Sequence, residues 1–280
     1  MLAGAAGVRT TLAAAGLVGA AVVTACAGAP GVSRATPAPV APAPASAAAP
    51  TSPAAASNPA GSAPAGSAPA GSAPAADPAL AIPNAPPAPL ADDATAATLL
   101  TDVRTADSTI RVELRYATPY NFTGGVLPGY EAPHALLRRE AAAALAQVQR
   151  TLAADGLGLK VFDAYRPVRA TEAMVAWTQR VHREDLLRDG YIASQSRHNL
   201  GVAVDLTLVD LATGRDLKMG TAFDTFAASA HTANATGEAA RNRARLVRAM
   251  SVAGFVNLPE EWWHFSYPVP DPRRFDLVIR

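Results

Sequence analysis

A long low-complexity stretch near the start of the 280-residue chain restricts where a folded core can form. From Ala27 to about Leu90 the sequence is nearly all Ala, Pro, Ser and Gly, with a short G-S-A-P-A repeat between Gly61 and Ala75. Few large apolar side chains are available there to offset the entropy that is lost when a chain becomes ordered. Residues 27–91 are therefore expected to form a disordered, partly polyproline tether. At roughly 3.1 Å per residue, its extended length would exceed about 100 Å.

The residues before this tether have the pattern of an export signal. Residues 1–26 contain one arginine, Arg9, then an apolar run from Thr11 to Val23, and they end in V-T-A-C. The run is too short and too rich in Ala and Gly to indicate a membrane span. The last four residues resemble a bacterial lipobox, and Cys26 is the only cysteine, so we expect Cys26 to be lipidated. The alternative is an ordinary small residue beside a conventional cleavage site.

This signal predicts where the protein is found. We expect an exported protein in the bacterial cell envelope, attached to the periplasmic or extracytoplasmic face of a membrane by a lipid on Cys26. The net charge of +1 gives no long-range attraction to nucleic acid, so no nucleic-acid partner is expected. The sequence identifies no protein partner.

Periodic hydrophobic patterns begin at about Asp92 and continue to Arg280, a length that suits one globular domain with a substantial core. Apolar residues at steps of three and four predict three helices, and two further apolar runs predict strands. The helices are expected around 137–152, 170–181 and 240–250, and the strands around 157–162 and 202–209. Because helices and short strands alternate without repeated βαβ units, the sequence predicts an α+β fold with a mainly antiparallel sheet flanked by helices.

The segment S-R-H-N-L-G-V-A-V-D, residues 196–205, places a histidine and an aspartate seven positions apart. On one helix His198 and Asp205 would lie roughly 10 Å apart along the axis, too far to share a metal ion whose bonds are about 2 Å long. A turn at Gly201 followed by a strand would instead bring them together. Because an unpaired buried carboxylate costs several kcal/mol, a bound cation would explain Asp205. A structural His–Asp pair at a capped strand end is the alternative.

The segment E-E-W-W-H-F, residues 260–265, contains a second pair of chemically active side chains. His264 could complete a His, Asp, His ligand set that leaves a fourth position open for water, as a catalytic zinc site requires. Glu261, three residues earlier, would then be the general base that accepts a proton from the attacking water. The alternative is that Trp262 and Trp263 are core residues beside a surface glutamate.

Four spaced motifs occur in one order along the predicted domain. They are Y-R-P at 165–167, S-R-H-N-L-G-V-A-V-D at 196–205, M-G-T-A-F-D at 219–224 and E-W-W-H at 261–264. Together they resemble the D-alanyl-D-alanine dipeptidases of the vancomycin-resistance type, which are zinc D,D-peptidases with a hedgehog-like fold. The similarity extends upstream through Y-A-T-P-Y-N-F-T-G at 116–124 and G-Y-E at 129–131, and so covers nearly all of residues 100–270.

The resemblance implies the ligands and the catalytic groups position by position. His198, Asp205 and His264 would bind zinc, with one ion per chain, and Glu261 would be the catalytic base. Arg166 would stabilise the oxyanion that forms when water attacks the peptide carbonyl, an effect often worth a few kcal/mol for one donor.

The resemblance also implies a substrate site. Asp224 would hold the ammonium group of the substrate, with Ser196 and Tyr130 as helpers. For Arg166, a structural ion pair with Asp163 is the alternative, and this pair can coexist with the catalytic role. The remaining histidines match no ligand position of the family and are not expected to bind the catalytic metal; they are His134, His182 and His231.

The predicted activity is hydrolysis of D-alanyl-D-alanine, or of a close D,D-dipeptide, in cell-wall peptide turnover. One alternative is a D,D-carboxypeptidase or endopeptidase that acts on peptidoglycan stem peptides in an open groove. The N-F-T-G, G-Y-E and M-G-T-A-F-D segments, at 121–124, 129–131 and 219–224, favour the dipeptidase. The other is a non-catalytic zinc-containing wall-binding domain, but such a domain has no need of Glu261 and Arg166. An enzyme anchored outside the cytoplasm would act on dipeptide released in the envelope.

Overall fold

The computed structural model describes residues 87–280. The predicted signal peptide, the lipidated cysteine and most of the predicted tether lie outside these residues and stay predictions. The last five tether residues, 87–91, are described and contact the domain, because the backbone of Arg274 forms hydrogen bonds of 2.9 Å with both Pro89 and Ala91. Within the described residues, no helix combines the length and the hydropathy that crossing a membrane requires.

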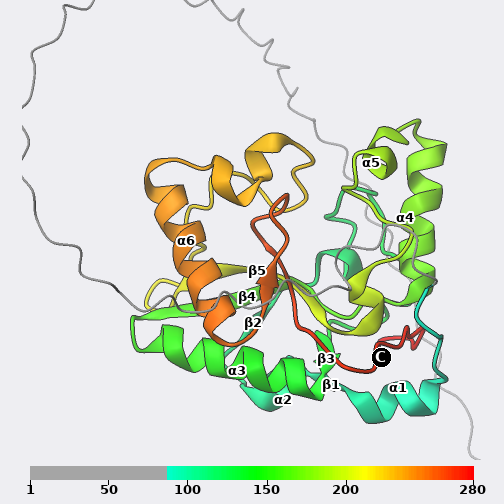
Figure 1. Cartoon of the computed structure of the whole chain (residues 1–280), viewed down its shortest axis with the longest axis horizontal. Coiled ribbons are helices and arrows are strands. Elements are labelled where there is room, and N and C mark those ends of the chain that lie inside the picture. The colour runs from blue at the N-terminus through cyan, green and yellow to red at the C-terminus, as the bar shows by residue number, and fades with distance from the viewer. Residues whose placement is uncertain (1–86) are drawn as a thin grey trace, which may run out of the picture. The chain divides into compact units, whose positions relative to one another are not determined.

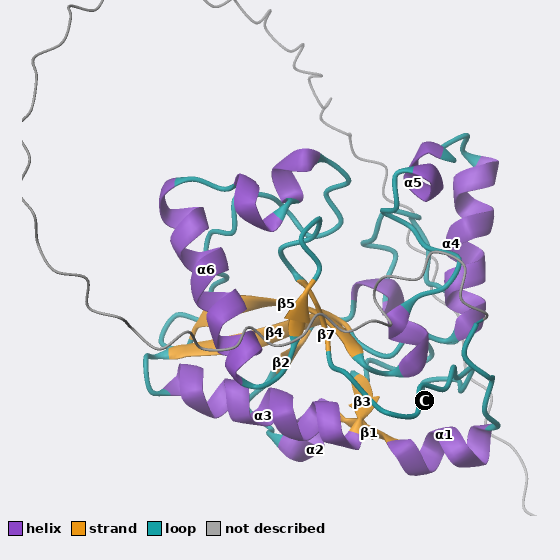
Figure 2. Ribbon diagram, in the orientation of Figure 1, coloured by secondary structure: helices purple, strands orange, loops and turns teal. Residues whose placement is uncertain are grey.

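A five-stranded sheet lies at the centre of the domain (Figure 2), in the order β2, β4, β5, β7, β6. The strands are β2 (Arg111–Val112), β4 (Leu157–Asp163), β5 (Ala203–Asp210), β6 (Val256–Asn257) and β7 (His264–Ser266). β2 pairs with β4 in parallel, and the other three pairings are antiparallel. A separate antiparallel pair joins β1 (Leu100–Asp102) to β3 (Leu136–Arg138). The predicted α+β class with a mainly antiparallel sheet is confirmed.

Six α-helices and four short 3₁₀ helices are found in the described residues. The α-helices are α1 (Asp93–Leu99), α2 (Val103–Ala106), α3 (Arg139–Ala153), α4 (Val168–Arg180), α5 (Asp185–Arg188) and α6 (Gly237–Val252). The 3₁₀ helices are η2 (Arg115–Ala117), η3 (Arg197–Leu200), η4 (Ala228–Ala230) and η5 (Thr232–Asn234). The long helices α3 and α6 contact each other and the central strands, whereas α4 and α5 stand at the opposite side of the view (Figure 1).

The helix α3 buries the apolar face that its sequence predicts, including Leu145, Val148 and Leu152, and its chain then turns at Gly156 with a φ of 71°. The predicted start of this helix is wrong by two residues. Leu137 lies in β3 opposite Thr101 of β1, because strand pairing there both satisfies its backbone and buries its side chain completely.

The buried face of α6 differs from the predicted one. The sequence predicts a face of Ala240, Ala244, Val247 and Met250, but the buried residues are Asn242, Arg243, Leu246 and Met250. The helix turns a different face inward because the charged side chain of Arg243 is buried, and a pattern of apolar residues does not reveal a buried charge. The Arg243 guanidinium donates to the carbonyls of Met219 at 2.7 Å, Ser229 at 3.1 Å and His231 at 2.7 Å. Arg243 therefore fastens the segment 219–231 to α6.

Candidate metal centre and active site

Three neighbouring strands bring acidic and imidazole side chains into one row. Asp163 of β4 lies opposite Asp205 of β5, and Asp205 lies opposite His264 of β7. Partners across antiparallel strands have Cβ atoms about 4.5–5.5 Å apart, so the strand register sets the spacing of these side chains. A register shift between Val161 and Asp163 lets Phe162 and Asp163 together oppose Asp205. Such a bulge re-aims the side chains of its strand, and here it turns Asp163 to the same face as Asp205.

His198 reaches this row from a turn. It lies in η3, which ends at Gly201 with a φ of 65°, and β5 begins two residues later. A Cβ atom on Gly201 would lie 2.5 Å from Cδ2 of Leu100, so a larger residue would clash as well as strain the backbone. The predicted reversal at Gly201 is confirmed, and it places Nε2 of His198 3.4 Å from Oδ2 of Asp205.

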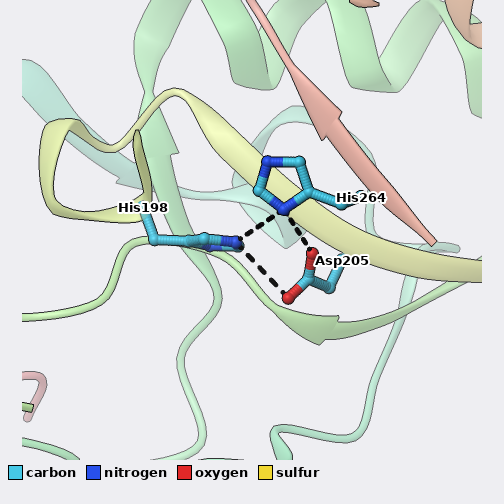
Figure 3. A group of neighbouring side chains, drawn as sticks. All are labelled: His198, Asp205 and His264. Carbon is cyan, nitrogen blue, oxygen red and sulfur yellow. Dashed lines mark hydrogen bonds and ion pairs between the residues drawn. The ribbon is translucent and has the colours of Figure 1, made fainter. Parts of the chain in front are cut away.

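His198, Asp205 and His264 converge on one point (Figure 3). Nδ1 of His264 lies 3.2 Å from Nε2 of His198 and 3.0 Å from Oδ1 of Asp205. Ligand atoms about 2 Å from a tetrahedral metal ion lie about 3.3 Å from each other. The three side chains therefore fit a metal ion, and they are the three that the sequence predicts as ligands.

The surrounding groups orient both imidazoles. Nδ1 of His198 donates to the carbonyl oxygen of Ala164 at 2.6 Å, which leaves the Nε2 lone pair facing the shared point. Nε2 of His264 lies 3.3 Å from Oγ of Ser266, while its Nδ1 faces His198 and Asp205.

The electrostatics of this group also suit metal binding. Burial lowers the pKa of His264, which favours the neutral imidazole that a metal needs. Burial alone would raise the pKa of Asp205, but His198 and His264 hold it below its usual range, so the carboxylate stays ionised.

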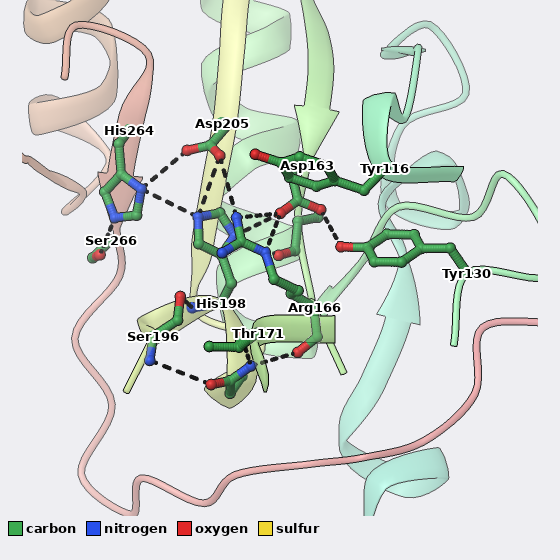
Figure 4. Close-up of polar contacts among 12 residues, drawn as sticks. Tyr116, Tyr130, Asp163, Arg166, Thr171, Ser196, His198, Asp205, His264 and Ser266 are labelled. Carbon is green, nitrogen blue, oxygen red and sulfur yellow. Dashed lines mark hydrogen bonds and ion pairs between the residues drawn. The ribbon is translucent and has the colours of Figure 1, made fainter. Parts of the chain in front are cut away.

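Asp163 connects the candidate metal ligands to a buried arginine (Figure 4). Its carboxylate is fully buried and accepts hydrogen bonds from the Tyr130 hydroxyl at 2.6 Å and from Nε and Nη2 of Arg166 at 3.0 and 2.8 Å. The same guanidinium lies 4.0 Å from Oδ2 of Asp205 and lines the cavity beside the ligands. The predicted Arg166–Asp163 pair is thus present, and it holds Arg166 where it can still face a substrate.

A cavity of about 450 Å³ opens beside the three ligands. Four other predicted site residues line it, namely Arg166, Ser196, Asp224 and Glu261. Oγ of Ser196 accepts a hydrogen bond from the backbone of His198 at 3.3 Å and so also caps η3. Tyr130 is absent from this lining, because its hydroxyl is bonded to Asp163 behind Arg166. His134, His182 and His231 are absent from it too.

Asp224 faces the cavity from a turn with a φ of 58°, a conformation that is uncommon for residues other than glycine. The Tyr116 hydroxyl donates to both of its carboxylate oxygens, at 3.0 and 3.1 Å. Burial and the charge of Asp205 raise the pKa of Asp224, so a cationic ligand would favour its ionised form. Tyr116 is a site residue that sequence reasoning missed, although it begins the 116–124 motif that carried part of the resemblance.

Glu261 completes the polar wall of the cavity. Its Oε2 lies 3.8 Å from Nδ1 of His264, and its side chain is 12% exposed. Burial, followed by the charges of Asp205 and Asp224, raises its pKa. A carboxyl with a raised pKa next to a metal position is suited to accepting and then returning a proton.

Comparison with known proteins places this geometry in a family. The profile of the D-Ala-D-Ala dipeptidase family of peptidases matches residues 96–274. The chain belongs to this family. Within it, the D-alanyl-D-alanine dipeptidase of Enterococcus faecalis is 37% identical over 180 residues, which cover 58% of this chain and 89% of the relative. That of Escherichia coli is 36% identical over 173 residues, which cover 61% and 86%.

Solved structures of D,D-peptidases are also similar to this chain. The vancomycin resistance D,D-dipeptidase VanXYg, in complex with a D-Ala-D-Ala phosphinate analog, matches with a TM-score of 0.32 at 20% identity, over 60% of this chain and 66% of that chain. A D,D-pentapeptidase VanY from a VanB-type cassette, in complex with Zn(II), has a TM-score of 0.31 at 15% identity, over 58% and 80%.

Proposed function

We propose that this protein is a zinc-dependent dipeptidase that hydrolyses D-alanyl-D-alanine or a close D,D-dipeptide. The observation that carries the proposal is a single cavity in which a His, Asp, His ligand set meets Arg166, Asp224 and Glu261. Membership of the D-Ala-D-Ala dipeptidase family and the names of the relatives support the choice of substrate.

Zinc suits the donor set because three nitrogen and oxygen ligands leave one position open, as in catalytic zinc sites. His198, Asp205 and His264 would hold the ion. When bound, zinc supplies Lewis-acid activation, which lowers the pKa of a water molecule and polarises the peptide carbonyl.

The protein's own residues would handle the proton and the developing charge. Glu261 would accept the proton of the attacking water and pass it to the nitrogen of the leaving amino acid. Arg166 would donate hydrogen bonds to the carbonyl oxygen as it becomes an oxyanion, from a position already fixed by Asp163. Asp224, held by Tyr116, would bind the ammonium of the substrate and so limit the substrate to a dipeptide with a free amino group.

The proposal is tested by measuring amino-acid release from a panel of D,D-peptides with and without a chelator, for the wild type and for Glu261→Ala. Chelation should abolish release and added zinc should restore it. Glu261→Ala should lower kcat by about 10²–10⁴-fold, the usual contribution of a general base, while the protein still binds one zinc ion. If zinc-loaded wild type hydrolysed no D,D-peptide, the non-catalytic wall-binding role would replace this proposal.

A D,D-carboxypeptidase or endopeptidase would use the same chemistry on longer chains. The half-buried carboxylate of Asp224 in the cavity favours the dipeptidase, because the amino group of a stem peptide is not free at that position. Alanine release from free D-Ala-D-Ala should therefore greatly exceed release from a muramyl pentapeptide. The reverse order would establish the carboxypeptidase.

The proposal extends to location, through the lipobox at Cys26 and the long tether that follows it. A lipid-anchored enzyme would recover or trim D-Ala-D-Ala released in the cell envelope, and would not reach a cytoplasmic precursor pool. The wild type should fractionate with membranes, and Cys26→Ala should not. Vancomycin resistance conferred by cytoplasmic dipeptide depletion would contradict this location.

A further inference from the structure

The cavity has a second, apolar wall that the steps above do not use. Four residues line it, three of them aromatic, and we refer to them as the aromatic wall: Phe122, Met174, Tyr191 and Phe226. The ring centroids of Phe122 and Phe226 are 5.1 Å apart, and those of Tyr191 and Phe226 are 5.9 Å apart. Trp177 of α4 packs edge-on against Phe122 at 5.0 Å. The wall is therefore a packed surface contributed by four separate segments of the chain.

Asp224 joins the aromatic wall to the ammonium site. Phe226 lies two residues after Asp224, and Tyr116, which donates to Asp224, packs edge-on against Phe122 at 6.0 Å. In a dipeptide, the first α-carbon is one bond of about 1.46 Å from the ammonium nitrogen. With the ammonium on Asp224, the side chain of the N-terminal residue would therefore begin beside this wall.

The cavity is larger than a dipeptide with two methyl side chains would fill. Its volume of about 450 Å³ falls within the range of about 300–1,000 Å³ that holds drug-sized ligands. Phe122, Tyr191 and Phe226 are only half-buried, so their rings keep apolar surface that a larger substrate side chain would remove from water. A methyl group would cover less of that surface than a larger apolar side chain.

We propose that the aromatic wall binds the side chain of the N-terminal residue, and that the enzyme prefers D,D-dipeptides in which this side chain is the size of leucine or phenylalanine. The inference rests on the proposed dipeptidase function and on the placement of the substrate ammonium at Asp224. It assigns a substrate class that extends beyond D-Ala-D-Ala.

The test compares kcat/KM of the zinc-loaded full chain for D-Ala-D-Ala, D-Leu-D-Ala and D-Ala-D-Leu. D-Leu-D-Ala should exceed D-Ala-D-Ala by about tenfold or more, since added methylenes in an apolar pocket change kcat/KM by such factors. D-Ala-D-Leu should gain less than D-Leu-D-Ala. A kcat/KM for D-Leu-D-Ala below that for D-Ala-D-Ala would overturn the proposed subsite alone. A gain for D-Ala-D-Leu equal to or larger than that for D-Leu-D-Ala would show that the subsite does not bind the N-terminal side chain. Failure of all three dipeptides would overturn the dipeptidase function itself.

A variant then assigns the preference to the wall. Phe226→Ala should lower the ratio of kcat/KM for D-Leu-D-Ala over D-Ala-D-Ala by about tenfold, and the milder Phe226→Leu should lower it less. Tyr267→Ala is the matched control, because this half-buried ring packs edge-on against Phe255 at 5.1 Å and lies outside the lining of the cavity. The control should keep the wild-type ratio. A wild-type ratio in both Phe226 variants would contradict the role of the wall.

Discussion

Among single residues, the carboxylates of Asp163, which is buried, and Asp224, which is half-buried, differ in how their charge is balanced. Asp163 has a cation of the protein as its partner, since Arg166 donates two hydrogen bonds to it. Asp224 accepts its hydrogen bonds from the neutral phenol of Tyr116. Asp163 is therefore suited to positioning Arg166, whereas Asp224 is suited to receiving a cation from outside the protein.

This difference predicts the effect of removing Asp224. Asp224→Ala should lower kcat/KM for D-Ala-D-Ala by about 30-fold or more, because losing one partner of an ion pair that the bound substrate covers costs about 2–5 kcal/mol. Tyr116→Phe, which removes one neutral donor, should lower it by about tenfold. Both variants should bind zinc stoichiometrically, as measured by metal analysis of the purified protein. An Asp224→Ala enzyme with normal dipeptide turnover would contradict the ammonium site.

Among the secondary-structure elements, the turn between η3 and β5 sets the position of His198, a proposed metal ligand. Gly201→Ala should lower the free energy of unfolding by about 2–4 kcal/mol, because a left-handed backbone costs about 1–2 kcal/mol and the new Cβ would meet Leu100 at 2.5 Å. Gly156→Ala is the matched control, since Gly156 has a φ of 71° and open space around it. Gly156→Ala should lower the free energy of unfolding only by the cost of the left-handed backbone, about 1–2 kcal/mol. Urea unfolding of both variants measures the difference, and equal losses would mean that the Leu100 contact is harmless.

Arg243 links α6 to the segment 219–231, which carries Asp224. Arg243→Met should lower the free energy of unfolding by about 3 kcal/mol, because the three hydrogen bonds that this cation donates to backbone carbonyls would be lost. The exposed Arg245 of the same helix offers the control, and Arg245→Met should change stability by less than about 0.5 kcal/mol. Thermal unfolding compares the two variants, and similar midpoints would argue against the anchoring role.

The same elements explain what could be predicted from the sequence. Apolar patterns predict β4, β5 and the body of α3. Spaced motifs, which can be recognised without knowing how the side chains pack, predict the candidate ligands. The register of β7 could not be predicted, because a three-residue strand carries little pattern and a slip of one residue reverses its faces. The bulge at Asp163 and the buried face at Arg243 were equally hidden, since both depend on hydrogen bonds between distant segments.

For the molecule as a whole, an ion bound by the proposed ligands would add to the stability of the fold. Its ligands come from η3, β5 and β7, so an ion held there would cross-link distant parts of the chain. Zinc at about 100 times its dissociation constant should stabilise the native protein by about 2.7 kcal/mol. The melting temperature of chelator-treated protein should rise on adding zinc, and that of His264→Ala should rise much less. Equal shifts in both proteins would place the stabilising ion elsewhere.

Metal binding and substrate choice depend on different parts of the fold, so they could change independently. The row formed by Asp163, Asp205 and His264 belongs to the first. The row is set by strand pairing in the sheet, whereas Phe122, Asp224 and Phe226 lie on connecting segments. Loops tolerate insertions and exchanges far better than paired strands do. Substitutions and length changes in the segments around 116–124 and 219–231 could therefore diversify which dipeptides are accepted, while the metal chemistry is inherited unchanged through the sheet.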